Sequence, residues 1–255
     1  MNAHRLRQLC TSVKVFLRLA VATLLLASCS EESTPEIPPS DNNTVDITYN
    51  FSSDAEGWLT DFADYPVGEE DFYELASGHA MLPPPLDETD GALRLSGSNR
   101  SDDLFMFAKK KLDGLSPNTT YKITFDMDIA SDAASGSVGI GGGPGEAVNI
   151  KIGASSVEPV KVIATEDFGY DAYYVMNIDK GNQFESGEDM IRIGDFENGI
   201  DEFVYALINR NNTQTPFEAQ TNDAGELWLV VGTDSGFEGI TTIYYTKIAV
   251  SLEPQ

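Results

Sequence analysis

The residue types that most often carry out covalent or metal chemistry are scarce in this chain. Its 255 residues include two histidines and two cysteines. His4 and Cys10 lie within residues 1–28, a segment we expect to be removed, which leaves His79 and Cys29. The remaining chain therefore has too few histidines and cysteines to make a serine–histidine pair, a cysteine–histidine pair or a soft-metal site an attractive prediction. His79, in "ASGHAMLP", is predicted to be a turn residue.

Carboxylates, in contrast, are abundant, with 41 Asp and Glu residues. Adjacent acids occur at Glu69-Glu70-Asp71 and at Asp102-Asp103. A glycosidase needs two carboxyls about 5 to 9.5 Å apart on either side of a sugar. Neighbouring acids are expected by chance in so acidic a chain, and sequence does not show apposition. Hydrolysis is therefore kept only as a less favoured alternative.

A polar, glycine-spaced stretch, "NIDKGNQFESGED" (177–189), offers oxygen ligands for Ca²⁺. Its candidate metal ligands are Asp179, Asn182 and Asp189. Calcium takes six to eight oxygens, but the spacing does not follow the EF-hand pattern. A solvated hairpin loop is the competing interpretation, so Ca²⁺ is a possible cofactor without further support. No other cofactor is predicted.

Two aromatic clusters are the candidate ligand-binding residues. They are Tyr170, Asp171, Tyr173 and Tyr174 in "DFGYDAYYV", and Tyr65 and Tyr73 in "TDFADYPVGEEDFYEL". Binding residues concentrate on loops carried by a rigid scaffold, and exposed aromatic rings can stack on sugar faces. Trp58 and Trp228 are predicted to lie in the core.

A glycine-rich stretch, residues 136–146, is predicted to be a turn between strands. It reads "GSVGIGGGPGE" and lacks the Lys-Ser/Thr pair of a phosphate-binding P-loop.

The N-terminus predicts export. Residues 1–18 carry four basic residues and no acid, and an apolar run, "LAVATLLLA", follows over residues 19–27. This run is too short to span a bilayer permanently and is typical of a signal peptide. Residues 1–28 are assigned to it. Residues 29–45 begin with Cys29 and continue as an acidic, proline-containing linker, and residues 46–255 are expected to form one domain.

The tetrapeptide "LASC" (26–29) resembles the lipobox of bacterial lipoproteins. The resemblance implies that Cys29 is lipidated and becomes the first residue of the mature chain. Serine after the cysteine, by the same resemblance, argues against retention in an inner membrane, so anchoring at the outer membrane is expected. The acidic "SEES" resembles the tract that sends some lipoproteins of the Bacteroidota type to the cell surface. A generic acidic linker explains "SEES" nearly as well.

Charge excludes several partners. The chain carries a formal charge of −25, which becomes about −29 without residues 1–28, because that segment holds four basic residues and no acid. Nucleic acid is not an expected partner, since no basic patch is available to contact phosphates. An anionic membrane surface would also repel the chain, so membrane attachment is expected through lipid only.

Short segments rich in Val, Ile, Tyr, Phe and Thr recur between Gly, Pro, Asn and Asp clusters and predict strands. The clearest is "TYKITFDMDIA" (120–130), whose apolar residues alternate with polar ones. The other predicted strands are 91–97, 103–112, 147–154, 226–232 and 242–252. Residues 200–210 fit helical and strand spacing, and the strand is preferred because its neighbours are strands. Many short strands without a long helix predict an all-β sandwich or jelly roll.

Three segments resemble jelly-roll carbohydrate-binding modules of the family 4/9 type. They are "YNFSSDAEGW" (49–58), "LDGLSPNTTYKITFDMDIAS" (112–131) and the closing "LWLVVGTD…TTIYYTKIAVSLEP". The resemblance covers about a third of the domain and implies a β-sandwich that binds glycan or polysaccharide without catalysis. Tyr245 and Thr246 stand where that family has an Asp near a structural calcium, so the resemblance does not extend to that ion. The alternative is an interaction lipoprotein with a protein partner at the cell envelope.

Overall fold

The computed structural model describes residues 43–164 and 172–255. These residues form fifteen β-strands and no helix, which confirms the predicted all-β class. Every strand pairing among them is antiparallel. Within the described ranges, no helix long and apolar enough to cross a membrane is found.

The larger of the two main sheets has seven strands. Its central order is β12 (Ala206–Asn211), β7 (Thr120–Ser131), β15 (Ile240–Pro254), β5 (Gly91–Ser98) and β4 (Ala76–Met81). β1 (Val45–Asn50) also pairs with β15, and β13 (Phe217–Gln220) also pairs with β7.

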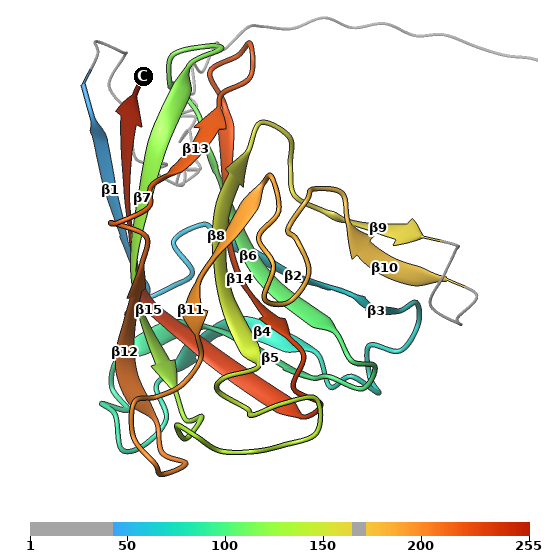
Figure 1. Cartoon of the computed structure of the whole chain (residues 1–255). Helices are drawn as coiled ribbons and strands as arrows, with labels where there is room; N and C mark the ends of the chain where they lie inside the picture. The colour runs from blue at the N-terminus through green and yellow to red at the C-terminus, as the bar shows by residue number, and fades with distance from the viewer. Residues whose placement is uncertain (1–42, 165–171) are drawn as a thin grey trace, which may run out of the picture. The chain divides into compact units, whose positions relative to one another are not determined.

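The second main sheet has five strands. They are ordered β11 (Met190–Asp195), β8 (Val148–Ser155), β14 (Leu227–Ser235), β6 (Leu104–Leu112) and β2 (Leu59–Ala63). A small third sheet joins β3 (Tyr65–Pro66), β10 (Tyr173–Met176) and β9 (Lys161–Ala164). In Figure 1, β9 and β10 lie side by side and project away from the five-stranded sheet.

The core lies between the two main sheets. In β7, Tyr121, Ile123, Phe125, Met127 and Ile129 are buried, and the polar residues between them are half-exposed, as the alternation predicts. Inward side chains of β6, β8 and β14 belong to the same apolar cluster. Because β8 and β14 are buried on both faces, something must also cover the outer face of the five-stranded sheet.

A smaller apolar cluster shows what covers part of that outer face. Phe105, Phe107 and Val230 on the sheet pack with Ile178 and Met190, which flank the loop 179–189. Gly153 in β8 allows this close approach, because a Cβ there would collide with the carbonyl oxygen of Asp189.

Three local predictions have mixed outcomes. Residues 136–146 contain neither strand nor helix, which confirms a loop there. Residues 206–211 form β12 as preferred, but residues 200–205 form neither strand nor helix. The turn prediction for His79 is wrong, since it lies in β4 and its Nε2 is 2.9 Å from the carbonyl oxygen of Phe51.

Candidate functional site

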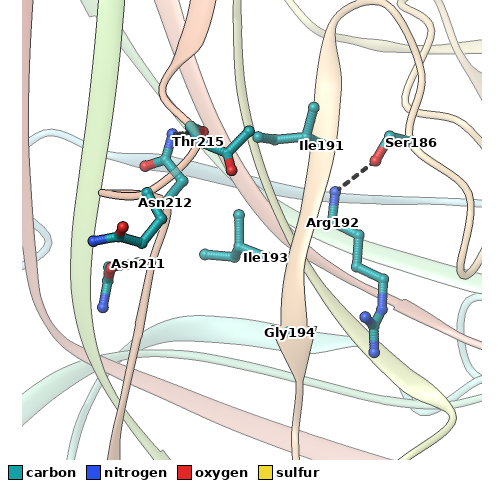
Figure 2. Close-up of a pocket in the computed structure, with 9 residues that line it drawn as sticks. Ser186, Ile191, Arg192, Ile193, Gly194, Asn211, Asn212 and Thr215 are labelled. Atoms are coloured by element: carbon teal, nitrogen blue, oxygen red, sulfur yellow. Dashed lines mark hydrogen bonds between the residues drawn. The ribbon is translucent and has the colours of Figure 1, made fainter.

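An open groove of about 420 Å³ lies on one flank of the sandwich. β11, the edge of the five-stranded sheet, forms one wall, and the turn from β12 to β13 forms the other. Figure 2 shows Ile191 and Ile193 pointing from β11 toward Asn211, Asn212 and Thr215. Arg192, between the two isoleucines, points to the opposite face, as alternation in a strand requires.

Some polar groups of this groove already have hydrogen-bond partners within the protein, and others do not. Asn212 is buried and ties its turn to β7, donating to the carbonyl of Ile123 at 3.0 Å and accepting from the N–H of Phe125 at 2.6 Å. In the described part of the chain, no hydrogen bond involves the Gln214 amide or the Thr215 hydroxyl. Ser186 Oγ accepts from the N–H of Arg192 at 3.0 Å, which leaves its own proton to donate.

The groove therefore combines an apolar floor with free amide and hydroxyl groups at its rim. Its volume lies in the usual range for small-ligand sites. Its lining contains no Asp, Glu, His or Cys. This composition can hydrogen-bond a neutral polyol, and the lining holds no carboxylate or imidazole that could act as a general acid or base.

The structure brings the two predicted tyrosine clusters together. Tyr174 pairs with Tyr65 across β10 and β3, with ring centroids 5.1 Å apart, and Tyr73 lies 5.6 Å from Tyr65. Tyr65, Tyr73 and Tyr173 are buried, so the expectation that they are exposed is wrong. They stabilise the attachment of the small sheet instead. Tyr170 and Asp171 lie outside the described residues, as does Cys29.

Tyr174 is the partly exposed member of that cluster. Lys161 lies with its Nζ 4.6 Å from the Tyr174 ring centroid, donates to Tyr65 Oη at 2.9 Å and pairs with Asp61 at 3.0 Å. These contacts engage the partly exposed ammonium with three neighbouring side chains, so it stabilises the packing of the small sheet and is not free to bind a ligand.

The predicted calcium ligands serve their own loop. Asp179 accepts backbone N–H groups from Gly181 and Glu188, each at 2.9 Å, and this lowers its pKa. Asp189 accepts from the N–H of Asp179 at 2.8 Å, and the carbonyl of Asn182 accepts from Glu185. The loop is held closed by these bonds, and calcium binding there stays a prediction.

A different group of acids does converge, beneath that loop. Carboxylate oxygens of Asp64, Asp103 and Asp234 lie within 4.8 Å of one another, close enough to share a cation. Lys180 Nζ, however, lies 2.8 Å from both Asp64 and Asp234, and Lys151 Nζ lies 2.7 Å from Asp234. Two ammonium groups already supply the positive charge, so this buried ion cluster does not fit a metal ion.

Burial governs the protonation of this cluster. It raises the pKa of Asp103 to about 9, assisted by the neighbouring Asp234 carboxylate, so Asp103 is neutral at pH 7. Burial lowers the pKa of Lys151. For Lys180, burial is outweighed by the Asp234 and Asp64 charges, which raise its pKa. The same lysines outweigh burial at Asp234 and hold its pKa low.

Sequence reasoning missed Trp228. Trp58 is buried as predicted, but Trp228 is only half-buried, on the outer face of β14, with Lys109 Nζ 5.5 Å from its ring centroid. The available signal was alternation, because Leu227 and Leu229 point into the core and the residue between them must point out.

A second, apolar pocket of about 250 Å³ lies between the glycine-rich loop and residues 196–203. Val138 and Phe203, in its lining, are 92% and 70% exposed. Asp132 also lines it, and burial raises the pKa of this carboxyl. Such an exposed apolar surface is typical of a protein-interaction site.

Comparison with known proteins yields no family assignment. No protein-family model and no curated protein sequence matches the chain.

Solved structures with a similar arrangement are distant. TmCBM61, in complex with β-1,4-galactotriose, aligns at a TM-score of 0.32 with 7% identity, over 79% of this chain and 97% of that one. A family 11 carbohydrate-binding module from Clostridium thermocellum, in complex with a β-1,3-1,4-mixed-linked tetrasaccharide, gives 0.35 and 11%, over 80% and 94%. The K1 cleaved adhesin domain of Lys-gingipain from Porphyromonas gingivalis W83 gives 0.34 and 13%, over 83% and 99%. We take neither site nor ligand from similarities at this level.

Proposed function

We propose that this protein is an exported glycan-binding module, and that the groove between β11 and the β12–β13 turn is its binding site. The observation that supports this proposal is the free amide and hydroxyl groups of Gln214, Thr215 and Ser186 above the isoleucine floor. Sugars present hydroxyls around an apolar ring face, and a site of this kind matches both parts. Without an aromatic platform, the expected affinity is weak, with a Kd on the order of 0.1–1 mM.

The ligand is expected to be neutral. The chain has a formal charge of −25, and an anionic polysaccharide would approach against that field. Binding without turnover follows from the lining, since glycoside hydrolysis needs a pair of carboxyls and the groove contains none.

A glycan array of neutral and uronic-acid-containing polysaccharides tests this proposal. We expect the chain from residue 30 onward to bind one neutral class. Gln214→Ala should weaken that binding about three- to tenfold, the usual effect of losing one hydrogen bond. Gln220→Ala is the matched control, because Gln220 is an exposed amide outside the groove lining that donates to the carbonyl of Asn118.

The variant Trp228→Ala tests whether glycan binds at the outer face of the five-stranded sheet instead of in the groove. If glycan binding is lost in Trp228→Ala and unchanged in Gln214→Ala, glycan binding stands but the groove assignment is wrong. If the folded protein binds no glycan at all, the function itself is wrong.

The second candidate function, binding a protein partner, is favoured by the apolar pocket. The three segments around it, 132–150, 196–209 and 236–246, carry six acids and no Lys or Arg. An acidic rim around exposed Val138 and Phe203 fits a partner segment with an apolar side chain between basic ones. Phe203→Ser should abolish capture of such a partner and leave glycan binding unchanged.

Anchoring at the outer membrane through a lipidated Cys29 is part of the proposal and rests on the "LASC" sequence. Cys29→Ser should move the protein from the membrane fraction to the soluble fraction. Cys10→Ser, within the predicted signal peptide, is the control and should not. Equal membrane association of both variants would contradict the anchor.

A further inference from the structure

The buried ion cluster places an amine, a carboxyl group and a neutral acid in one sealed site. Lys151 in β8 and Asp234 in β14 lie on neighbouring strands, and both side chains are completely buried. Lys151 Nζ is 2.7 Å from Asp234 Oδ2. Figure 1 shows β8 and β14 running side by side.

The third member, Asp103, has a carboxyl oxygen within 4.8 Å of an oxygen of Asp234, and burial together with the Asp234 carboxylate raises its pKa. Among the described residues, the Oδ1 atoms of Asp103 and Asp234 are both buried and have no hydrogen-bond partner. A proton carried by Asp103 therefore has Asp234 as its acceptor. Phe105 and Phe107 stack nearby on the same sheet face, which keeps the surroundings apolar.

We propose that Lys151 and Asp234 form an intramolecular isopeptide bond, with Asp103 relaying the proton. The reaction joins a lysine ammonium and an aspartate carboxylate to give one amide and one water, so it needs no oxidant or co-reactant. It is independent of the proposed glycan function.

The steps follow from the contacts. In the reactive form, one proton of Lys151 has moved to Oδ1 of Asp234, and the burial of both side chains lowers the cost of this neutral pair. The Nζ lone pair then attacks Cγ, and negative charge develops on Oδ2. Asp103 gives its proton to Oδ1 and receives one from Nζ, the Cγ–Oδ1 bond breaks, and water leaves.

Oδ2 is already surrounded by donors. Lys180 Nζ lies 2.8 Å from it and the N–H of Gln183 lies 3.0 Å from it, so both stabilise the developing oxyanion and later the amide carbonyl. The amide N–H keeps a partner too, because Lys151 Nζ lies 2.8 Å from the carbonyl oxygen of Lys180.

Lys151, rather than Lys180, is the nucleophile. Burial lowers the pKa of Lys151, which makes its neutral amine accessible, whereas neighbouring carboxylates raise the pKa of Lys180. Lys180 keeps its charge and serves as an electrostatic donor. Holding the reacting groups on paired strands replaces an encounter in solution with a fixed geometry.

Peptide mapping of the membrane-extracted protein by mass spectrometry tests the bond. We expect trypsin not to cut after Lys151, and peptides 123–161 and 211–247 to appear joined, one water lighter than their sum. Asp103→Asn, close to isosteric, should leave the two peptides separate. Asp128→Asn, in β7 outside the cluster, is the control and should retain the join.

Separate peptides in the folded wild-type protein would overturn the proposal and leave a purely ionic cluster. A join through Lys180 would overturn the assignment of the nucleophile. If Asp103→Asn still yields the joined peptides, the proton relay is wrong. Lys151→Arg keeps the positive charge without a reactive amine and should give no join.

Discussion

The groove and the buried ion cluster share one loop and differ in how they use polar groups. Residues 179–189 line the groove with Ser186 on one side and cover the cluster with Lys180 and Gln183 on the other. In the cluster, Lys151 Nζ contacts three oxygens and is sealed from water. In the groove, the Gln214 amide and the Thr215 hydroxyl have no hydrogen-bond partner among the described residues.

Because of this difference, we expect the ion cluster to contribute to the stability of the fold and the groove to contribute to ligand binding. A buried charge is tolerated only when its partners are in place, so the cluster fixes the outer face of the five-stranded sheet. Free polar groups at a solvent-exposed groove contribute little to folding and are available to a ligand. Substitutions should therefore affect unfolding in one region and binding in the other.

The largest effect is expected from Lys151→Met. It leaves the buried Asp234 carboxylate with Lys180 as its remaining cation, and breaking a buried ion pair costs about 3–5 kcal/mol. Thermal and urea unfolding measure this loss, which any loss of a covalent bond to Asp234 would increase. A change below about 1 kcal/mol would contradict the role assigned to the cluster.

Replacing both partners sharpens that result. The double variant Lys151→Met, Asp234→Leu removes both buried groups, so it should unfold less readily than Lys151→Met alone. A double-mutant cycle from urea unfolding gives the coupling energy. Strictly additive losses would show that Lys151 and Asp234 do not interact.

The groove should behave in the opposite way. Thr215→Ala together with Gln214→Ala is expected to reduce glycan affinity about tenfold, with a change in unfolding free energy below about 0.5 kcal/mol, as is usual for surface positions. Calorimetric titration and urea unfolding of the same sample measure both. If the double variant loses stability but keeps its glycan affinity, the groove residues serve folding and not ligand binding.

The smallest effect is expected at an exposed ion pair. Lys247 Nζ lies 2.7 Å from Asp128 Oδ2. Burial of Asp128 is outweighed by its hydrogen bonds from Lys247 and Asn209, which lower its pKa. The pair therefore stabilises above the ordinary carboxyl pKa of about 3.9, and its contribution is lost as pH falls through the lower, folded value.

Asp128→Asn should consequently cost at most about 1 kcal/mol at pH 7, because both side chains are partly exposed. The difference from the wild-type protein should shrink below about pH 4. Unfolding curves at several pH values test this. If the difference in unfolding free energy between the wild-type protein and the variant grows at acidic pH, the pKa of Asp128 is raised in the folded state and not lowered.

The fold could be predicted from local patterns, but the site could not. Alternation in residues 120–130 and the turn at Pro117-Asn118 predict β7, and the structure agrees. The groove joins residues near 190 with residues near 214 across two different sheets, and no local spacing records that proximity. The two tyrosine clusters were predicted as separate candidate binding residues, and their burial depends on the pairing of β3 with β10, which no local pattern records.

The ion cluster shows the same limit. In the sequence, Asp103 is one of two adjacent acids of a kind expected by chance. No motif or spacing marks Lys180 or Asp234 as members of a site. Their meaning comes from strand pairing and from the loop above them, which together exclude water. Charge count alone does not distinguish a solvated acid from a buried one.

The central claim is that the groove binds a neutral glycan, and amide NMR of the labelled chain during titration tests it most directly. We expect shifts to concentrate in residues 186, 191–194 and 211–215, with residues around Lys151 and Asp234 unchanged. Saturable shifts confined to the outer face around Trp228, or to the apolar pocket around Phe203, would contradict it.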